Sequence, residues 1–263
     1  MTFDYSAQPK EKVQSCNLCG WQKFTRVGNK DRYGFDVEAV SCDGCGLVFL
    51  AERMTAPAYG QFYEEGHYRG LLKAPRNEPY DMKLARIQAN YATWLAWWLK
   101  SKLEGRRYQT LLDVGGSTGS VAELIARDHG LRATVMEPSS AEGRRAVTRG
   151  LNLIPQSIED YEPNGERWDV VLLCQTIDHL LDIMKALQTI RSLVNPGGMF
   201  FVDITDYRQK LLRYGMEKTL KIDHPYYLTP MHTESYLERA RFKVADRWGG
   251  VLYYQMAFLC EPR

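Results

Sequence analysis

Along the second half of the chain, short apolar runs alternate with amphipathic segments. Apolar runs of strand length lie at 110–114, 132–137, 152–155, 168–174 and 199–205. Segments with apolar residues every three or four positions, the spacing of helices, lie at 120–130, 140–149 and 182–194. Alternating strands and helices build a parallel sheet that is covered by helices on both faces. The pattern therefore predicts an α/β fold.

The last part of the chain departs from this alternation. A helix is predicted at 229–242, with Thr233 as its N-cap. Two strand-like runs follow at 242–248 and 251–262, separated by Gly249–Gly250. Because strands joined by a glycine turn form a hairpin, we expect one antiparallel strand to extend the parallel sheet.

The first half of the chain falls into three parts. Residues 1–12 are polar and are expected to form a disordered tail, and residues 13–50 combine short β-like runs with two cysteine pairs. Residues 51–107 are expected to be a connector that becomes helical from Tyr80 to about Leu103. Apolar residues recur in that helix at three- and four-residue spacing and predict a packed core face, made of Leu84, Ile87, Tyr91, Trp94, Leu95 and Trp98.

Composition and charge exclude few classes of protein. The chain has 263 residues, of which 44% are hydrophobic and 25% charged, enough to bury a sizeable core. A net charge of +2 indicates neither a nucleic acid nor an anionic membrane as the partner. No apolar run approaches the roughly 20 residues of a membrane span, and the first residues lack the layout of a signal peptide. We therefore expect a cytoplasmic protein.

Four of the six cysteines form two C-x-x-C pairs. Cys16 pairs with Cys19 and Cys42 with Cys45, and a glycine follows each pair. Each pair presents two sulfurs to one tetrahedral ion, and the spacing is close to that of Cys₄ zinc sites. Four thiolates leave no open position, so the sequence predicts a structural zinc ion that stabilises a small module. A redox dithiol, two unrelated pairs and an iron–sulfur cluster are the alternatives.

The segment LLDVGGSTGS joins a strand to a helix. Gly115, Gly116 and Gly119 would let a ligand approach the backbone, but serines interrupt the G-x-G-x-x-G pattern of nicotinamide folds. Asp113 precedes the glycines, and Glu137 ends the next strand. A carboxylate at the second position suits a ribose diol, and an acid in the first turn suits a cationic sulfonium ligand. Glycines that only pack the core are the alternative.

These motifs, in this order, resemble those of class I S-adenosylmethionine-dependent methyltransferases. The resemblance covers roughly 108–263 and rests on DVGGSTG, VMEPS, QSIEDY, WDVVLLCQTIDHLLD and LVNPGG. CNLCG, CDGCGLVFL and QFYEEGHY resemble the zinc-ribbon-bearing branch, which includes sugar C-methyltransferases. The resemblance implies a Rossmann-like seven-stranded sheet with a final antiparallel hairpin, a small N-terminal zinc-ribbon-like module, and S-adenosylmethionine as cofactor. Ser117 replaces the usual middle glycine, and Asp178 the usual glutamate.

The resemblance also implies a cofactor site built from the loops after the strands. The first loop would line the methionine end, the acid of the second strand would hold the ribose hydroxyls, and two further loops would flank the adenine and close the near wall. In that order the residues are Asp113, Gly115, Gly116, Ser117 and Gly119; Glu137, Pro138 and Ser139; Ser157 and Ile158; and Cys174 and Gln175.

Methyl transfer from a sulfonium is an in-line displacement, in which the protein positions the acceptor and removes a proton where one must leave. A hydroxyl or carbon acceptor needs a general base, which typically contributes about 10²–10⁴-fold. His179 follows the strand at 168–174, at the edge where open α/β sheets bind ligands, and is our first candidate. His224 is the second. A helix-start histidine bonded to a backbone carbonyl is the alternative for His179.

Three functions fit this sequence. The favoured one is a methyltransferase acting on a small molecule, namely a sugar, nucleotide-sugar or natural-product intermediate. An rRNA methyltransferase with a zinc module is the second, and it would be expected to carry a basic face. A non-catalytic scaffold is the third, and the intact glycine loop disfavours it. We therefore predict an enzyme whose partner is a small-molecule acceptor.

Overall fold

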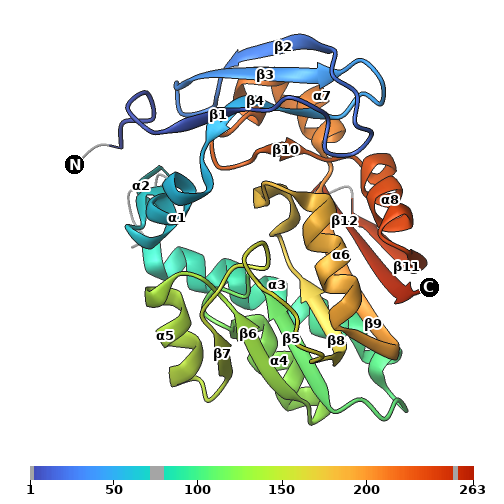
Figure 1. Ribbon diagram of the computed structural model, residues 1–263. Coiled ribbons are helices and arrows are strands. Elements are labelled where there is room, and N and C mark those ends of the chain that lie inside the picture. The colour runs from blue at the N-terminus through green and yellow to red at the C-terminus, as the bar shows by residue number, and fades with distance from the viewer. Residues whose placement is uncertain (1–2, 72–79, 251–253) are drawn as a thin grey trace.

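The computed structural model describes residues 3–71, 80–250 and 254–263, which form a small sheet stacked above a larger α/β unit (Figure 1). Within these residues the larger sheet has seven strands in the order β11-β12-β9-β8-β5-β6-β7. The strands are β5 (Thr110–Val114), β6 (Arg132–Met136), β7 (Asn152–Ile154), β8 (Trp168–Leu173), β9 (Val194–Thr205), β11 (Phe242–Gly250) and β12 (Gln255–Pro262).

The pairing of these strands confirms the expected sheet. Strands β5 to β9 run parallel, and β12 is inserted antiparallel between β9 and β11. Strand β5 pairs with β6 on one side and with β8 on the other. The order of the strands reverses at β5, and open α/β sheets bind their ligands beyond the carboxyl ends of the strands at such a point.

Helices cover both faces of the large sheet. They are α3 (Tyr80–Leu103), α4 (Ser120–His129), α5 (Ser140–Thr148), α6 (Ile183–Leu193) and α8 (Pro230–Arg239). On the core face that was expected for α3, Leu95 and Trp98 are buried. Ile87 is 51% exposed and does not belong to that face. The side chain of Leu84 lies outside the described part of the structure. None of the described helices is long and apolar enough to cross a membrane.

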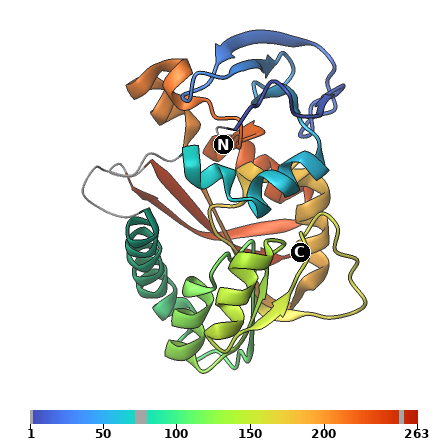
Figure 2. The same cartoon turned by 90° about the vertical axis from the view of Figure 1, so that its left-hand side faces the viewer.

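The small sheet combines four strands from the N-terminal part of the chain with one short strand from its C-terminal part. It contains β1 (Lys10–Lys12), β2 (Phe24–Lys30), β3 (Asp36–Cys42), β4 (Val48–Met54) and β10 (Tyr226–Tyr227). Strand β10 pairs with β4, so the expected boundaries at residues 50 and 108 do not separate independent units. Helices α1 (Ala56–Glu64) and α2 (His67–Leu71) lie between this sheet and the α/β unit (Figure 2).

Several expected details are wrong. Residues 3–12 are not a disordered tail, because Tyr5 is buried and β1 pairs with β4. The N-cap of α8 is Thr229 rather than Thr233, and its side chain accepts the His232 N–H. Strand β11 runs through Gly249–Gly250, which pair with β12 and do not form the turn. The stretch before β10, to which the sequence analysis assigned no helix or strand, contains the capped helix α7 (Tyr207–Thr219).

Candidate functional site

The glycine loop connects β5 to α4 at the carboxyl edge of the sheet. Gly119 has a φ of 75°, and a Cβ there would lie 2.5 Å from the Leu151 Cδ1, so both backbone and packing require glycine. Ser117, which stands where glycine is usual, adopts the same left-handed region with a φ of 50°. This turn points its backbone N–H toward Glu137.

Glu137 is held by the backbone on both of its oxygens. Its Oε2 accepts the Ser117 N–H and its Oε1 the Ser139 N–H, both at 2.9 Å. These bonds fix the carboxylate at the carboxyl end of β6, beside the glycine loop. A fixed carboxylate with unused lone pairs can accept hydroxyl hydrogens from a diol.

Two acids are buried at the ends of the central strands. Burial and the charge of Glu137 raise the pKa of Asp113 to about 7, and its Oδ1 has no hydrogen-bond partner among the described residues. Burial also raises the pKa of Asp203 to about 7, although this carboxyl accepts the Gln175 N–H at 2.8 Å. Asp203 was missed by the sequence analysis, because an acid late in an apolar strand carries no motif. A buried acid with an unused oxygen, such as Asp113, suits a cationic ligand, whereas both oxygens of Asp203 accept from Gln175.

The other residues that the resemblance assigned to the cofactor site lie in or next to the loops that follow strands β6, β7 and β8. Ser157 bonds Asp160 through its hydroxyl, whereas Ile158 is buried in the core. Ser139 is the N-cap of α5, and its neighbour Pro138 is exposed. Burial raises the pKa of the Cys174 thiol well above its usual value, so this cysteine stays a neutral thiol.

The two candidate histidines lie together. Their ring centroids are 4.4 Å apart, although 45 positions separate them in the sequence. His179 ends the short helix η1 (Ile177–His179), and His224 lies two residues before β10. Asp178 joins them, with its Oδ2 2.8 Å from the His224 Nδ1 and its Oδ1 3.9 Å from the His179 Nε2.

His224 is bonded on both ring nitrogens. Its Nδ1 faces Asp178, and its Nε2 lies 2.9 Å from the Lys221 Nζ. Burial lowers the pKa of His224 to about 4, so the ring is neutral and donates Nδ1–H to the carboxylate while Nε2 accepts from the ammonium group. Burial opposes ionisation of Asp178, but His224 holds the pKa of this carboxyl below its usual range. His224 therefore bridges an acid and a lysine and has no lone pair to spare.

His179 is different, because one of its nitrogens is available. Its Nδ1 lies 2.9 Å from the Tyr63 hydroxyl, which in turn reaches the Asp223 carbonyl at 3.4 Å. When Tyr63 donates to that carbonyl, His179 donates Nδ1–H to Tyr63, and its Nε2 keeps a lone pair. The Asp178 carboxylate would then stabilise the imidazolium that forms when Nε2 takes up a proton. Tyr63 was also missed from the sequence, since nothing local links it to residue 179.

Among the described residues, two side-chain clusters have the composition of metal sites. One is Asp178, His179 and His224, whose ligand atoms lie within 4.8 Å of one another. Lys221 places an ammonium group on the His224 Nε2, which requires an accepting nitrogen there and a proton on Nδ1. A cation on that Nδ1 would need a different tautomer and would be repelled by the lysine, so this donor set does not fit a metal.

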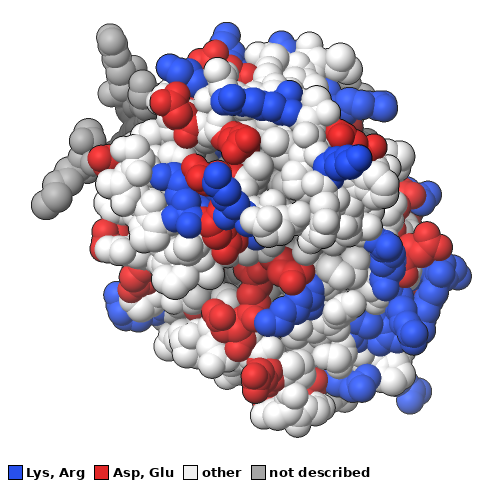
Figure 3. All heavy atoms as spheres, turned by 45° about the horizontal axis from the view of Figure 1, so that its top comes forward, with Lys and Arg blue, Asp and Glu red and all other residues white. Residues whose placement is uncertain are grey.

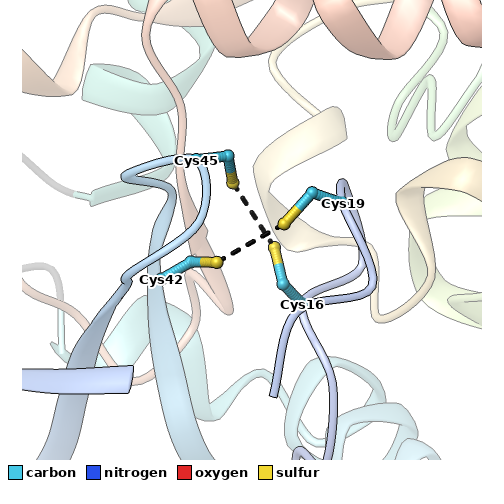
Figure 4. A group of neighbouring side chains, drawn as sticks. All are labelled: Cys16, Cys19, Cys42 and Cys45. Atoms are coloured by element: carbon cyan, nitrogen blue, oxygen red, sulfur yellow. Dashed lines mark hydrogen bonds between the residues drawn. The ribbon is translucent and has the colours of Figure 1, made fainter. Parts of the chain in front are cut away.

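The four paired cysteines form the second cluster. Their thiols point toward a common centre (Figure 4), with Cys16 and Cys45 sulfurs 3.6 Å apart and Cys19 and Cys42 sulfurs 3.5 Å apart. Sulfurs bound at about 2.3 Å to a tetrahedral zinc ion lie about 3.8 Å apart, so the geometry fits zinc. The glycine after each pair donates its N–H to the carbonyl of the first cysteine at 2.8 Å.

The cysteine cluster is bonded to the loop that follows His179. Asn17, between the first two cysteines, donates to Asp182 at 2.8 Å and accepts the Met184 N–H at 3.2 Å. Asp182 is the N-cap of α6. His232 of α8 contacts the Cys45 carbonyl at 3.0 Å. The two C-x-x-C turns are therefore bonded to α6 and α8, the helices that follow His179 and His224 in the sequence.

The sheet order, the glycine loop and the two strand-end acids define an S-adenosylmethionine-dependent methyltransferase. A family model described as a methyltransferase domain matches residues 82–246, and the chain belongs to this family. The ubiquinone biosynthesis O-methyltransferase of Methylobacterium sp. (strain 4-46) is 28% identical over 163 residues, which are 56% of this chain and 65% of that protein. The one from Dinoroseobacter shibae is 30% identical over 54% of this chain and 62% of its own length. The chain thus spans less than two thirds of these relatives.

Solved structures show the same fold at low sequence identity. Magnesium protoporphyrin IX methyltransferase from Synechocystis PCC 6803 with bound SAH has a TM-score of 0.59 at 13% identity, covering 77% of this chain and 97% of that one. DesVI of Streptomyces venezuelae has a TM-score of 0.56 at 16% identity, covering 73% of this chain and all of its own. Both share the fold of this chain, and the first of them is a methyltransferase with bound SAH.

Proposed function

We propose that this enzyme transfers a methyl group from S-adenosylmethionine to a hydroxyl of a small molecule, with His179 as the general base. The observation that carries the proposal is the free Nε2 of His179 beside Asp178, at the carboxyl edge that also bears the glycine loop. The relatives' O-methyltransferase names support oxygen as the acceptor atom. A sugar, nucleotide-sugar or natural-product intermediate remains our proposal for the acceptor class.

In the proposed reaction the cofactor supplies an electrophilic methyl group. Asp113 and Asp203 would face its cationic end, and Glu137 its ribose. The acceptor hydroxyl would donate its proton to the His179 Nε2 as its oxygen bonds the methyl carbon and the carbon–sulfur bond breaks. The resulting imidazolium would be paired with Asp178, and S-adenosylhomocysteine would be the product.

We further propose that the cysteine cluster holds a structural zinc ion. The four sulfurs supply a closed tetrahedral set, which gives the ion no position for substrate. The rRNA alternative finds less support, since basic and acidic side chains are interspersed on the face in Figure 3 and form no continuous basic stripe there.

The test is calorimetric titration of the purified protein with S-adenosylhomocysteine, with the zinc content measured on the same sample. We expect micromolar binding and about one zinc ion per chain. A folded, zinc-loaded protein that fails to bind would refute the enzymatic proposal and favour a scaffold. Transfer of a labelled methyl group to hydroxylated small molecules, compared with RNA, then tests the acceptor class.

A further inference from the structure

Helix α1 contacts both the proposed base and the proposed cofactor side of the molecule. Its last residues are Tyr63 and Glu64. The Tyr63 hydroxyl lies 2.9 Å from the His179 Nδ1, and the Glu64 carboxylate reaches the N-terminus of α5. In Figure 2 this helix lies between the small sheet and the α/β unit. Two adjacent residues of one helix therefore touch both halves of the site.

Glu64 bonds the first residue of α5 with both of its carboxylate oxygens. Its Oε2 accepts the Ser140 N–H at 2.8 Å, and its Oε1 accepts from the Ser140 hydroxyl. These two bonds lower the pKa of Glu64. An N–H in the first turn of a helix has no partner within the helix, and the positive end of the helix dipole favours a carboxylate there. Glu64 thus caps a helix that begins 76 positions further along the chain.

The residue that Glu64 holds is next to the loop that fixes the proposed ribose acid. Ser139 is the N-cap of α5, and its N–H donates to the Glu137 Oε1 at 2.9 Å. The bond from Glu64 to Ser140 therefore holds the end of α1 against the segment that would border the ribose of the cofactor.

The two sides of α1 are held unequally. On the side of the small sheet, Tyr59 and Phe62 are buried, and the Tyr59 hydroxyl donates to the Ile222 carbonyl at 2.7 Å. On the side of α5, both Glu64 and Ser140 are exposed to solvent. Water competes for exposed hydrogen bonds, so the α5 side is the one at which α1 separates more easily.

We propose that Glu64 is a positioning residue that holds α1 closed over the cofactor site, so that the cofactor enters and leaves only when the bond to Ser140 is broken. The inference rests on the proposed function. Because the bond joins two parts of the protein and no part of the ligand, it should form in the empty and in the loaded protein alike. It would then limit entry and exit equally and leave the equilibrium affinity unchanged. The same closed position seats Tyr63 on His179, so closure would also orient the base.

The test is a stopped-flow measurement of the association and dissociation rates of S-adenosylhomocysteine with the full chain. Glu64→Ala should raise both rates about threefold to tenfold, while the dissociation constant changes by less than about twofold. Ser140→Pro should have the same effect, because it removes both donors and proline suits the first position of a helix. The preceding Ser139 already has the extended backbone that proline requires, with a φ of −69° and a ψ of 120°.

Glu65→Ala is the matched control. Glu65 is the exposed neighbour of Glu64, and its carboxylate bonds Gln61 and His67 rather than α5. Both rates should therefore equal those of the wild type. When Glu64→Ala and Ser140→Pro are combined, the rates should be no faster than in either single variant, because both changes remove the same bonds.

The outcomes separate this inference from the proposed function. Wild-type rates in both Glu64→Ala and Ser140→Pro would overturn the inference and leave the methyltransferase standing. Faster dissociation with unchanged association would also overturn it, since that result indicates a lost contact to the ligand and not a helix that opens. Equal acceleration in Glu65→Ala would do the same. A wild-type protein that binds no S-adenosylhomocysteine would contradict the proposed function, and this inference with it.

Discussion

Affinity for S-adenosylhomocysteine should depend on pH through Asp113. This carboxyl is buried at the end of β5, and burial together with the charge of Glu137 raises its pKa to about 7. Without ligand, about half of the Asp113 carboxyls are therefore protonated near pH 7. When the ligand's ammonium group binds beside the carboxylate, as we propose, the pKa should fall toward its usual value of about 4 and a proton should leave.

Linkage gives the size of this effect. With a pKa of about 7 in the free protein, the ionised fraction falls from about nine tenths at pH 8 to about one tenth at pH 6. The dissociation constant should therefore rise about tenfold over that interval, and about half a proton should be released per ligand near pH 7.

Calorimetric titration across that interval, in two buffers of different ionisation enthalpy, measures both quantities. The Asp113→Asn variant should bind S-adenosylhomocysteine more weakly than the wild type at pH 8. Its dissociation constant should also lack the roughly tenfold rise between pH 8 and pH 6. Asp128→Asn, at an exposed surface carboxylate, should behave like the wild type. A dissociation constant that stays the same across the interval, or the full dependence persisting in Asp113→Asn, would refute the placement of Asp113 at the cationic end of the cofactor.

Four further changes test other parts of the molecule. His179→Gln should lower methyl-transfer turnover by about 10²–10⁴-fold while leaving affinity for S-adenosylhomocysteine unchanged, and unaltered turnover would remove His179 from the mechanism. The pKa of His224 is about 4 in the folded protein and about 6.5 when unfolded, so the unfolded chain takes up a proton first as the pH falls. The neutral His224 therefore stabilises the fold above about pH 6.5, and the free energy of unfolding should fall by about 2 kcal/mol between pH 7 and pH 5. In urea unfolding, the His224→Gln variant should lack this loss. Gly119→Ala should destabilise the fold by about 2–3 kcal/mol, and more than Gly105→Ala, because both have a φ of 75° but only at Gly119 does the new carbon meet an atom, the Leu151 Cδ1. Removal of zinc by a chelator should lower methyl-transfer turnover more than it lowers affinity for the cofactor. A chelated protein that keeps full turnover would show that the C-x-x-C turns do not help to position the histidines.

The sequence predicts the large sheet well because its information is local. Runs such as TLLDV and WDVVLL are apolar enough to be strands wherever they are placed, and the C-x-x-C spacing brings two sulfurs together within one turn. The hydrophobic pattern does not predict helix α7, because its apolar residues Leu212 and Tyr214 are exposed and Gly215 kinks the helix. Strand β1 reads Lys-Glu-Lys and becomes a strand only through pairing with β4.

The site is harder to predict because its members come from distant segments. Tyr63 reaches His179 across 116 positions, and the His224 ring is brought to Asp178 from a separate segment of the chain. A histidine next to an acid can be noticed in a sequence, but the tautomer that makes one histidine a base depends on partners that only the fold supplies.

Tyr226 connects the small sheet to the segments that carry the two histidines. Its backbone pairs with Phe49 in β4, two residues after His224, which fixes that histidine to the small sheet. Its hydroxyl accepts from Arg53 at 3.1 Å and donates to the Leu181 carbonyl at 2.8 Å, two residues after His179. One buried tyrosine therefore sets the positions of both histidines relative to the cysteine-bearing sheet. We therefore expect a chain trimmed back to the methyltransferase sheet to keep the glycine loop but to lose the geometry of the proposed base.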